Sequence, residues 1–276
     1  MKKETMNTYN HNSKMDVNLF NLLEQNIGDL EFFLCYLKQK ESEHFTKYLV
    51  HLEQNLVKLV TSSFMKEDTI NFLGKLDILS QHISLFTTAI DAYLSICGFD
   101  YHPMSLSNQQ TSVYKNDILR GMTFLRYYQA VSLLSIMNKP KAIQFTKDYV
   151  DYHAEKRRPV EKVDCIDDII DKTDEWPALF DESFCLTKFK YTEGAVGYKT
   201  YKCRWHEMVK ELKDPDFCYA AICHYDFRGA SLMNEKFVLT RKQTLIQEKP
   251  YCDFVWHDKT IHKTCEHPDE SFWEKL

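Results

Sequence analysis

Glycine and proline are scarce in this chain, which contains seven of each among its 276 residues. Average proteins contain about 7% glycine and about 5% proline. Because these residues supply many tight turns, their scarcity argues against a barrel or sandwich of many short strands and favours long helices. The sequence also lacks any run of roughly 18 consecutive apolar residues, the length that a membrane-spanning helix needs, so we expect no membrane partner.

The chain has no excess of positive charge. Its 35 Lys and Arg residues stand against 40 Asp and Glu residues, which gives a formal net charge of −5. A basic footprint is the usual mark of a nucleic-acid-binding protein, so we expect no nucleic-acid partner. The first residues, MKKETMNTYNHNSKMD, contain lysines without the apolar segment of a secretory signal, which predicts a cytoplasmic protein. There the nine cysteines are expected to be reduced thiols.

The first half of the chain has the pattern of a helical region. Residues 1–15 are polar and carry no period, and we predict a disordered tail there. From Asp16 onward, apolar residues recur three and four positions apart, which is the spacing of an amphipathic helix. Helices are therefore predicted near 19–34, 45–60, 68–97, 114–137 and 140–155, with a loop over 98–112. The amino-terminal helices are a candidate surface for a homo-oligomer.

The pattern changes near residue 180, where apolar and polar residues begin to alternate with a period of two. Helices followed by a small antiparallel sheet with interposed helices make an α+β fold. Strands are predicted near 183–192, 196–203, 234–246 and 251–257, with a hairpin turn at Glu193-Gly194 and helices near 205–213 and 215–232. The chain is thereby divided into the tail 1–15, a helical region of unassigned role 16–112, an α+β domain 113–260 and a polar tail 261–276.

Three residues are candidates for catalysis. Cys203 ends a predicted strand just before a predicted helix, where backbone N–H groups and the helix dipole favour thiolate over thiol; the alternative is a small buried apolar residue. Cys223 and Asp226 are three apart on one predicted helix and therefore share a face. They can act as nucleophile and proton acceptor, or as two contacts of one bound molecule. The alternative is an apolar thiol beside a solvated acid.

The last predicted strands carry candidate substrate-binding residues. Thr240, Arg241 and Thr244 offer a guanidinium and two hydroxyls, which suit a substrate carboxylate; the alternative for the arginine is a surface charge. Cys252 and Asp253 are neighbours on one strand and point to opposite sides of the sheet. Only one of this pair can therefore face a given pocket.

The sequence does not predict a metal site or a cofactor. The three candidate thiols lack the close C-x-x-C spacing of zinc fingers. The final residues carry a mixture that could bind zinc, but without a hydrophobic framework around its last three members, so we interpret them as part of a polar tail. This mixture comprises His257, His262, Cys265 and His267.

Taken together, four motifs resemble the L-2-amino-thiazoline-4-carboxylic acid hydrolase family. The segments YKCRWHEMVKEL, CYAAICHYDF and FVLTRKQTLIQEKPYCDFVW match the family's Cys before a short helix, its C-x-x-D helix, its T-R-x-x-T strand and its C-D-F strand. The stretch NKPKAIQFTKDYVDYH is similar to the helix ahead of the family's sheet. The resemblance covers roughly residues 115–258. It departs from the family at QEKPY, where a glycine is usual, and residues 1–110 match nothing.

The resemblance implies hydrolysis of a small cyclic amidine. Water adds at the C=N carbon of the thiazoline ring and the ring thiolate leaves, which gives an N-carbamoyl amino acid. The implied roles are Cys203 or Cys223 as nucleophile or ring contact, Asp226 as general acid/base and Arg241 as carboxylate clamp. Because sites diverge on shared scaffolds, two alternatives stay open: a non-catalytic module that binds or senses a small molecule, and a tailoring enzyme of a biosynthetic pathway.

Overall fold

The computed structural model describes residues 4–5, 14–61, 74–99, 110–157, 160–171 and 184–276. Its contacts group the chain into two compact units. We call Asn12–Tyr149 the helical unit, and Met1–His11 together with Val150–Leu276 the sheet unit. The division falls inside helix α7 (Lys139–Arg157), whereas the sequence places a domain boundary at residues 112–113.

The helical unit follows the spacing of its apolar residues. In α1, Leu30, Leu34 and Leu37 are fully buried because they lie on one face of the helix. The predicted helix start at residue 68 lies outside the described residues, and the predicted loop over 98–112 ends in a strand. The elements are β2 (Lys14–Asn18), α1 (Leu19–Lys40), α2 (Phe45–Val57), α4 (Ile78–Gln81), α5 (Ile83–Ile96), β3 (Gln110–Tyr114), α6 (Lys115–Ser132) and the start of α7.

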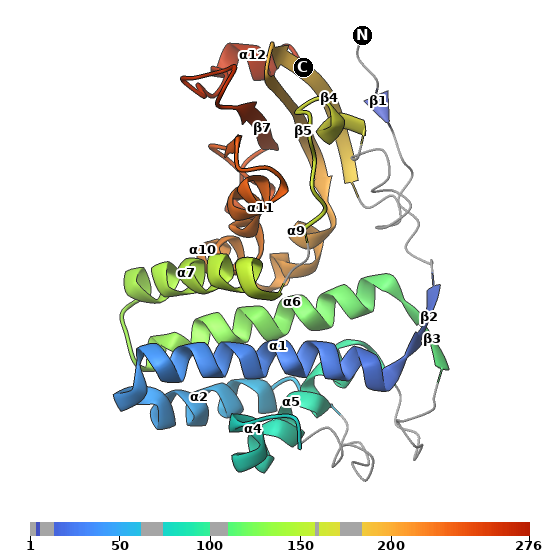
Figure 1. Cartoon of the computed structure of the whole chain (residues 1–276). Coiled ribbons are helices and arrows are strands. Elements are labelled where there is room, and N and C mark those ends of the chain that lie inside the picture. The colour runs from blue at the N-terminus through green and yellow to red at the C-terminus, as the bar shows by residue number, and fades with distance from the viewer. Residues whose placement is uncertain (1–3, 6–13, 62–73, 100–109, 158–159, 172–183) are drawn as a thin grey trace. The chain divides into compact units, whose positions relative to one another are not determined.

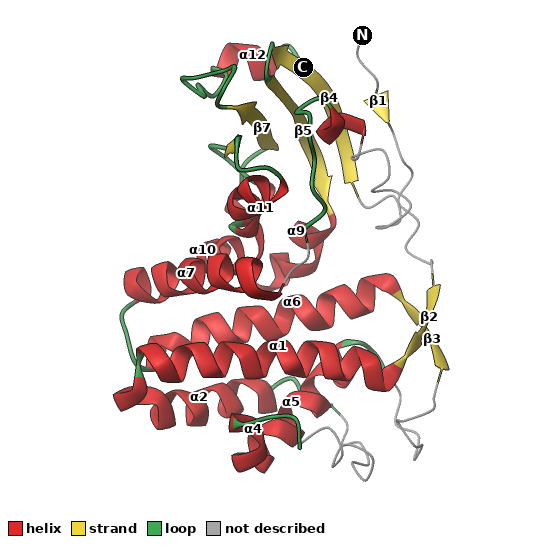
Figure 2. Cartoon of the chain, viewed as in Figure 1, coloured by secondary structure: helices red, strands yellow, loops and turns green. Residues whose placement is uncertain are grey.

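The sheet unit is built on a five-stranded sheet with the order β1-β4-β5-β7-β6, and all its neighbours are antiparallel. Figure 2 shows these strands in yellow and the helices in red. Together with the helical unit, this sheet confirms the predicted α+β class. The strands are β1 (Glu4–Thr5), β4 (Phe184–Thr192), β5 (Ala195–Cys203), β6 (Phe237–Thr240) and β7 (Cys252–Asp258).

The hairpin between β4 and β5 turns at Glu193-Gly194, as predicted. Gly194 has a φ of +71°, a conformation that glycine adopts without penalty. A Cβ at this position would also lie 2.7 Å from the side chain of Ile261. The turn therefore needs glycine both for its backbone conformation and for its close packing.

Strand β6 is shorter than the predicted strand 234–246. It ends at Thr240, and the chain then makes a 3-10 turn at Leu245–Gln247. The backbone N–H groups of Lys242 and Gln243 donate to the Asp253 carboxylate instead of to a neighbouring strand. A carboxylate eleven residues after Lys242 and ten after Gln243 thus ends the strand, and local propensity does not reveal this.

Three α-helices, a 3-10 turn and a π-helical turn link β5 to β6. The predicted helix near 205–213 is α9 (Arg204–Val209) followed by a 3-10 turn. The predicted helix 215–232 is divided into α10 (Pro215–Cys218), a π-helical turn (Tyr219–Cys223) and α11 (Tyr225–Met233). The helix thus forms where the sequence places it, but it contains an irregular turn in its middle.

The two faces of the sheet are covered by different elements. The face that packs on α11 buries Tyr198, Leu239 and Trp256, together with apolar residues of the segment 163–170. The opposite face buries Val255 against Trp273 of α12 (Glu270–Glu274). We call these the α11 face and the α12 face (Figure 1).

The last residues differ from the expected polar tail. Trp273 is only 2% exposed, and Phe272 and Leu276 pack beside it on the α12 face. Lys199 donates from Nζ to the Trp273 carbonyl at 2.5 Å, which ties α12 to the centre of the sheet. Residues 261–276 therefore supply part of the core of the sheet unit.

Among the described helices, none combines the length and the apolar character that crossing a lipid bilayer would require.

Candidate active site

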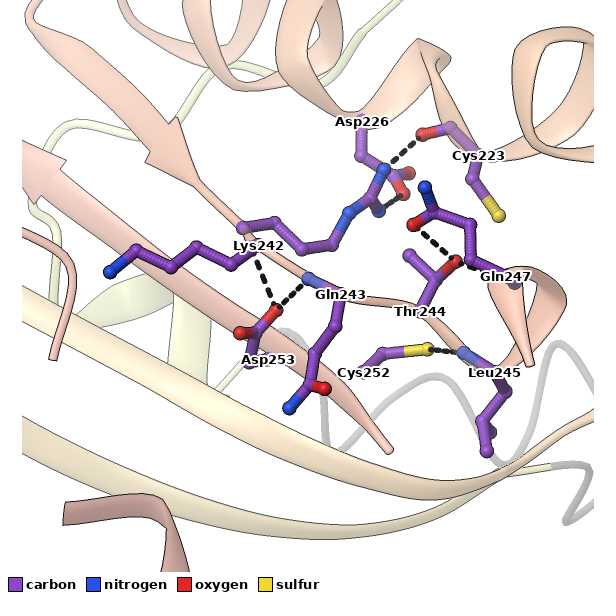
Figure 3. A network of polar contacts seen from close by, with 10 residues as sticks. Cys223, Asp226, Lys242, Gln243, Thr244, Leu245, Gln247, Cys252 and Asp253 are labelled. Carbon is purple, nitrogen blue, oxygen red and sulfur yellow. Dashed lines mark hydrogen bonds and ion pairs between the residues drawn. The ribbon is translucent and has the colours of Figure 1, made fainter. Parts of the chain in front are cut away.

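The α11 face carries an arginine–aspartate pair where β6 ends. Arg241 Nη1 donates to Asp226 Oδ2 at 2.6 Å, and Arg241 Nη2 donates to the Cys223 carbonyl at 2.8 Å. The arginine side chain is 1% exposed, whereas that of Asp226 is 35% exposed. Figure 3 shows Asp226 and Cys223 side by side at the edge of this network. The pair therefore has a buried cation and an accessible carboxylate.

Aromatic rings surround the guanidinium. Its central carbon lies 4.9 Å from the ring centroids of Phe227 and Phe254 and 5.4 Å from that of Tyr219. Burial alone would lower the pKa of Arg241, but Asp226 and its other neighbours outweigh burial and raise this pKa above its ordinary value. The arginine is thus permanently charged and held in one orientation. These rings are not recognisable as part of a site from the sequence, since aromatic residues alone carry no site signal.

The π-helical turn provides the carbonyl that the arginine binds. The His224 N–H donates to the Tyr219 carbonyl at 3.1 Å, and the Phe227 N–H donates to the His224 carbonyl at 3.3 Å. The turn thus changes the hydrogen-bonding register of the helix at Cys223, whose carbonyl accepts from Arg241. Turns of this kind occur frequently at functional sites.

Three free thiols meet at this pair. Burial raises the pKa of Cys203 to about 11, that of Cys252 to about 12 and that of Cys223 well above its usual value. Asp226 and Arg241 are close enough to influence all three pKa values. The structure therefore places Cys203, Cys223, Cys252, Asp226 and Arg241 near one another on this face.

At Cys203, the structure supports the second of the two interpretations, a buried thiol, over a thiolate favoured by the helix start. The backbone N–H groups of His206 and Trp205 do lower the pKa of Cys203, as its place at the start of α9 predicts. Burial has the larger effect, however, and the net shift is upward. Cys203 is therefore a protonated thiol at neutral pH.

Two of the predicted substrate-binding residues shape the loop after β6. Thr244 is fully buried; its hydroxyl donates to Gln247 Oε1 at 3.0 Å and accepts from the Gln247 N–H at 3.2 Å. Cys252 is also buried, and its sulfur accepts from the Leu245 N–H at 3.2 Å. Figure 3 shows both interactions. Both side chains therefore form hydrogen bonds within the protein and stabilise the 3-10 turn that follows Arg241 in the chain.

Thr240 and Asp253 belong to the α12 face. Asp253 Oδ1 accepts from the N–H groups of Lys242 and Gln243 at 3.0 and 2.9 Å, and Oδ2 lies 3.0 Å from His267 Nε2. The Thr240 hydroxyl lies 2.9 Å from His267 Nδ1. The structure therefore separates Cys252 from Asp253, as their adjacent places on a strand require. It also gives Asp253 a partner, His267, that the sequence analysis assigned to a polar tail.

The sequence model of the family described as L-2-amino-thiazoline-4-carboxylic acid hydrolase matches residues 126–256. No curated protein matches the chain. The matched residues include Cys203, Cys223, Asp226 and Arg241, so the site lies inside the match. Residues 126–256 of this chain are therefore similar to the L-2-amino-thiazoline-4-carboxylic acid hydrolase family.

Proposed function

We propose that this chain hydrolyses a small cyclic amidine of the 2-amino-thiazoline-4-carboxylate type to an N-carbamoyl amino acid. One observation carries the proposal: the Arg241–Asp226 pair lies among three thiols inside the segment that matches the hydrolase family. A carboxylate that is partly exposed and fixed by a buried cation can exchange protons with a bound molecule. The neighbouring thiols offer a polarisable lining for a sulfur-containing ring.

The reaction requires two proton movements. The oxygen of water forms a bond to the amidine carbon, and one water proton passes to a base while the ring nitrogen is protonated. The carbon–sulfur bond then breaks, the hydroxyl of the intermediate loses its proton as the carbonyl forms, and the ring sulfur leaves as a thiol. Water is consumed, and no oxidant or reductant is needed. The site must therefore supply one group that accepts and returns a proton.

Asp226 is the group proposed to move these protons. Arg241 lies 2.6 Å from its Oδ2, and a neighbouring cation favours the charged form of a carboxylate. Asp226 therefore begins the cycle as a base toward water and ends it as an acid toward the leaving sulfur. A positioned group of this kind contributes roughly 10²–10⁴ in rate.

The thiols are proposed as ring contacts. A covalent mechanism would need a thiolate, because the thiolate is the nucleophilic form. Burial raises the pKa of both Cys203 and Cys223, so thiolate is scarce near pH 7. Water activated by Asp226 is therefore better supported as the nucleophile than either thiol.

Arg241 is proposed as a positioning residue. Both of its terminal nitrogens are engaged, one by Asp226 and one by the Cys223 carbonyl. These contacts favour a role in orienting Asp226 over the carboxylate clamp that the family resemblance implies. If Arg241 only orients Asp226, a group other than Arg241 binds the substrate carboxylate.

The test is release of thiol from 2-amino-thiazoline-4-carboxylate, followed with a thiol reagent. Asp226→Asn should lower kcat by about 10²–10⁴. Asp167→Asn is the matched control, because it removes a carboxylate from an exposed ion pair of the same unit and should leave turnover unchanged. Full activity in Asp226→Asn would refute the role of this carboxylate.

A wild-type protein without turnover on the acid or its ring analogues would refute the hydrolase function. Binding of the acid measured by calorimetry would then support the non-catalytic alternative.

A further inference from the structure

The α12 face carries a cluster of metal-ligating side chains that the proposed hydrolysis does not use. His257, His262 and Cys265 each offer one ligand atom, and these three atoms lie within 4.8 Å of one another. The Nδ1 atoms of the two histidines are 3.1 Å apart, and their rings are stacked. His257 is fully buried, whereas the other two are partly exposed. The cluster is therefore anchored on the sheet side and accessible from the loop side.

The chain after β7 folds so that these residues converge. Asp258 begins a tight loop, in which its carboxylate accepts from the Thr260 N–H at 2.9 Å and its carbonyl accepts from the His262 N–H at 2.7 Å. Cys265 has a φ of +46°, an uncommon conformation for a residue other than glycine. Its N–H donates to the His262 carbonyl at 3.2 Å. This conformation brings the Cys265 thiol next to the two imidazoles.

A chain of hydrogen bonds sets the orientation of the His257 lone pair. As a carboxylate, Asp253 can only accept, so His267 donates to it from Nε2, and the tautomer that carries its single proton there accepts at Nδ1. The Thr240 hydroxyl, 2.9 Å away, then donates to His267 and accepts from His257 Nε2, which lies 2.8 Å away. His257 Nδ1 is therefore left as an acceptor that points at His262. Metal-binding histidines are typically held by such partners on their other nitrogen.

We propose that His257 Nδ1, His262 Nδ1 and Cys265 Sγ bind a zinc ion. Imidazole and thiolate are donors that zinc prefers, whereas calcium and magnesium prefer oxygen. Bonds of about 2.0–2.3 Å place the ligands of a tetrahedral zinc roughly 3.3–3.8 Å apart. The two histidine nitrogens, 3.1 Å apart, are already close to this spacing, and the partly exposed Cys265 thiol needs to approach them by about 1 Å. Three protein ligands leave the fourth position to water.

Zinc binding has a defined proton balance. The proton of the Cys265 thiol leaves to solvent, and the proton of His262 on Nδ1 is replaced by one on Nε2. His257 keeps its proton on Nε2, so the hydrogen bonds to Thr240, His267 and Asp253 persist. The ion would tie the loop 258–265 to β7, and this inference does not rest on the proposed hydrolysis.

The experiment uses the full chain, stripped with a chelator and then loaded with Zn²⁺ or Co²⁺. Wild type should retain one ion per chain after gel filtration, and Co²⁺ should give a thiolate-to-metal charge-transfer band. Cys265→Ser should abolish the band, whereas Cys165→Ser, a matched change at an exposed free cysteine of the same unit, should retain it. Thr240→Val should keep the band but weaken binding about 10–100-fold, since it removes only a supporting hydrogen bond.

A labelling measurement keeps the test decisive if Cys265→Ser fails to fold. In wild type, Zn²⁺ should protect Cys265 but not Cys165 from iodoacetamide, as seen by peptide mass spectrometry. A chain that binds neither ion would overturn the proposal. So would a charge-transfer band that survives Cys265→Ser, because the thiolate would then come from another cysteine.

Discussion

The two faces of the sheet carry polar networks of opposite character. On the α11 face, a buried guanidinium and an accessible carboxylate lie among protonated thiols and aromatic rings. On the α12 face, a buried carboxylate begins a row of imidazoles and a hydroxyl that runs to the loop after β7. One face therefore holds a fixed charge pair, and the other holds a row of hydrogen-bonding groups that ends at the proposed zinc site.

The difference arises from the alternation of side chains along two strands. Thr240 and Arg241 are neighbours in sequence, as are Cys252 and Asp253, and each pair is divided between the faces. The faces are nevertheless linked, because Asp253 binds the backbone of Lys242 next to Arg241. A change on the α12 face can therefore reach the site on the α11 face through this loop.

The largest expected effect is on the reactivity of Cys203, where burial raises the pKa of the thiol and the start of helix α9 lowers it. With a pKa of about 11, only about 10⁻⁴ of this thiol is ionised at pH 7, and the thiolate is the reactive form. Its rate of alkylation should rise about tenfold per pH unit from pH 7 toward 11. Quantitative peptide mass spectrometry measures this rate against exposed Cys165. Rapid labelling of Cys203 at pH 7 would contradict a raised pKa and would support the interpretation of Cys203 as a thiolate.

A smaller effect is expected when the α12 face loses its carboxylate. Asp253→Ala leaves two backbone N–H groups and His267 without their acceptor. Breaking a buried, paired charge in this way typically costs about 3–5 kcal/mol of unfolding free energy, which urea denaturation measures. Asp253→Asn retains one acceptor oxygen and should cost less. The exposed control Asp167→Ala should stay within about 0.5 kcal/mol, and an equally small change in Asp253→Ala would contradict this account.

The smallest expected effect concerns Arg241→Lys on the α11 face. Lysine retains the charge but cannot reach Asp226 and the Cys223 carbonyl with one planar group. Loss of one hydrogen bond to a charged group costs about 1.5–3 kcal/mol, which corresponds to about 10–100-fold in kcat. A positioning role predicts that kcat falls while KM changes little. A rise in KM at constant kcat would instead show that Arg241 holds the substrate carboxylate.

Local patterns in the sequence account for much of the fold. The three-and-four spacing of Leu30 and Leu34 predicts a buried helix face, and Glu193-Gly194 predicts the hairpin. Alternation along β7 predicts that Cys252 and Asp253 separate. Each of these features depends on residues close together in the chain, so a local pattern is enough to reveal it.

The features that the sequence analysis missed depend on contacts between distant segments. Strand β6 ends early because of Asp253, and His267 is ordered by stacking on Trp273 at 5.4 Å. The pKa of Cys203 likewise depends on distant segments. Its position at the start of a helix predicts a lowered pKa, whereas burial by the rest of the fold raises it. Neither the burial of a thiol nor the partner of a carboxylate is encoded in local spacing.

The π-helical turn makes the site sensitive to the length of the chain. Such a turn holds one residue more than an α-helical turn, so it can be regarded as a single-residue insertion between Pro215 and Met233. Deleting one residue there would allow a regular helix and rotate the two ends relative to each other by about 100°. A lineage that lost this residue would keep the helix and lose the alignment of Cys223 and Asp226 with Arg241. A one-residue deletion at this turn should therefore abolish the arrangement of the site while the helix still forms.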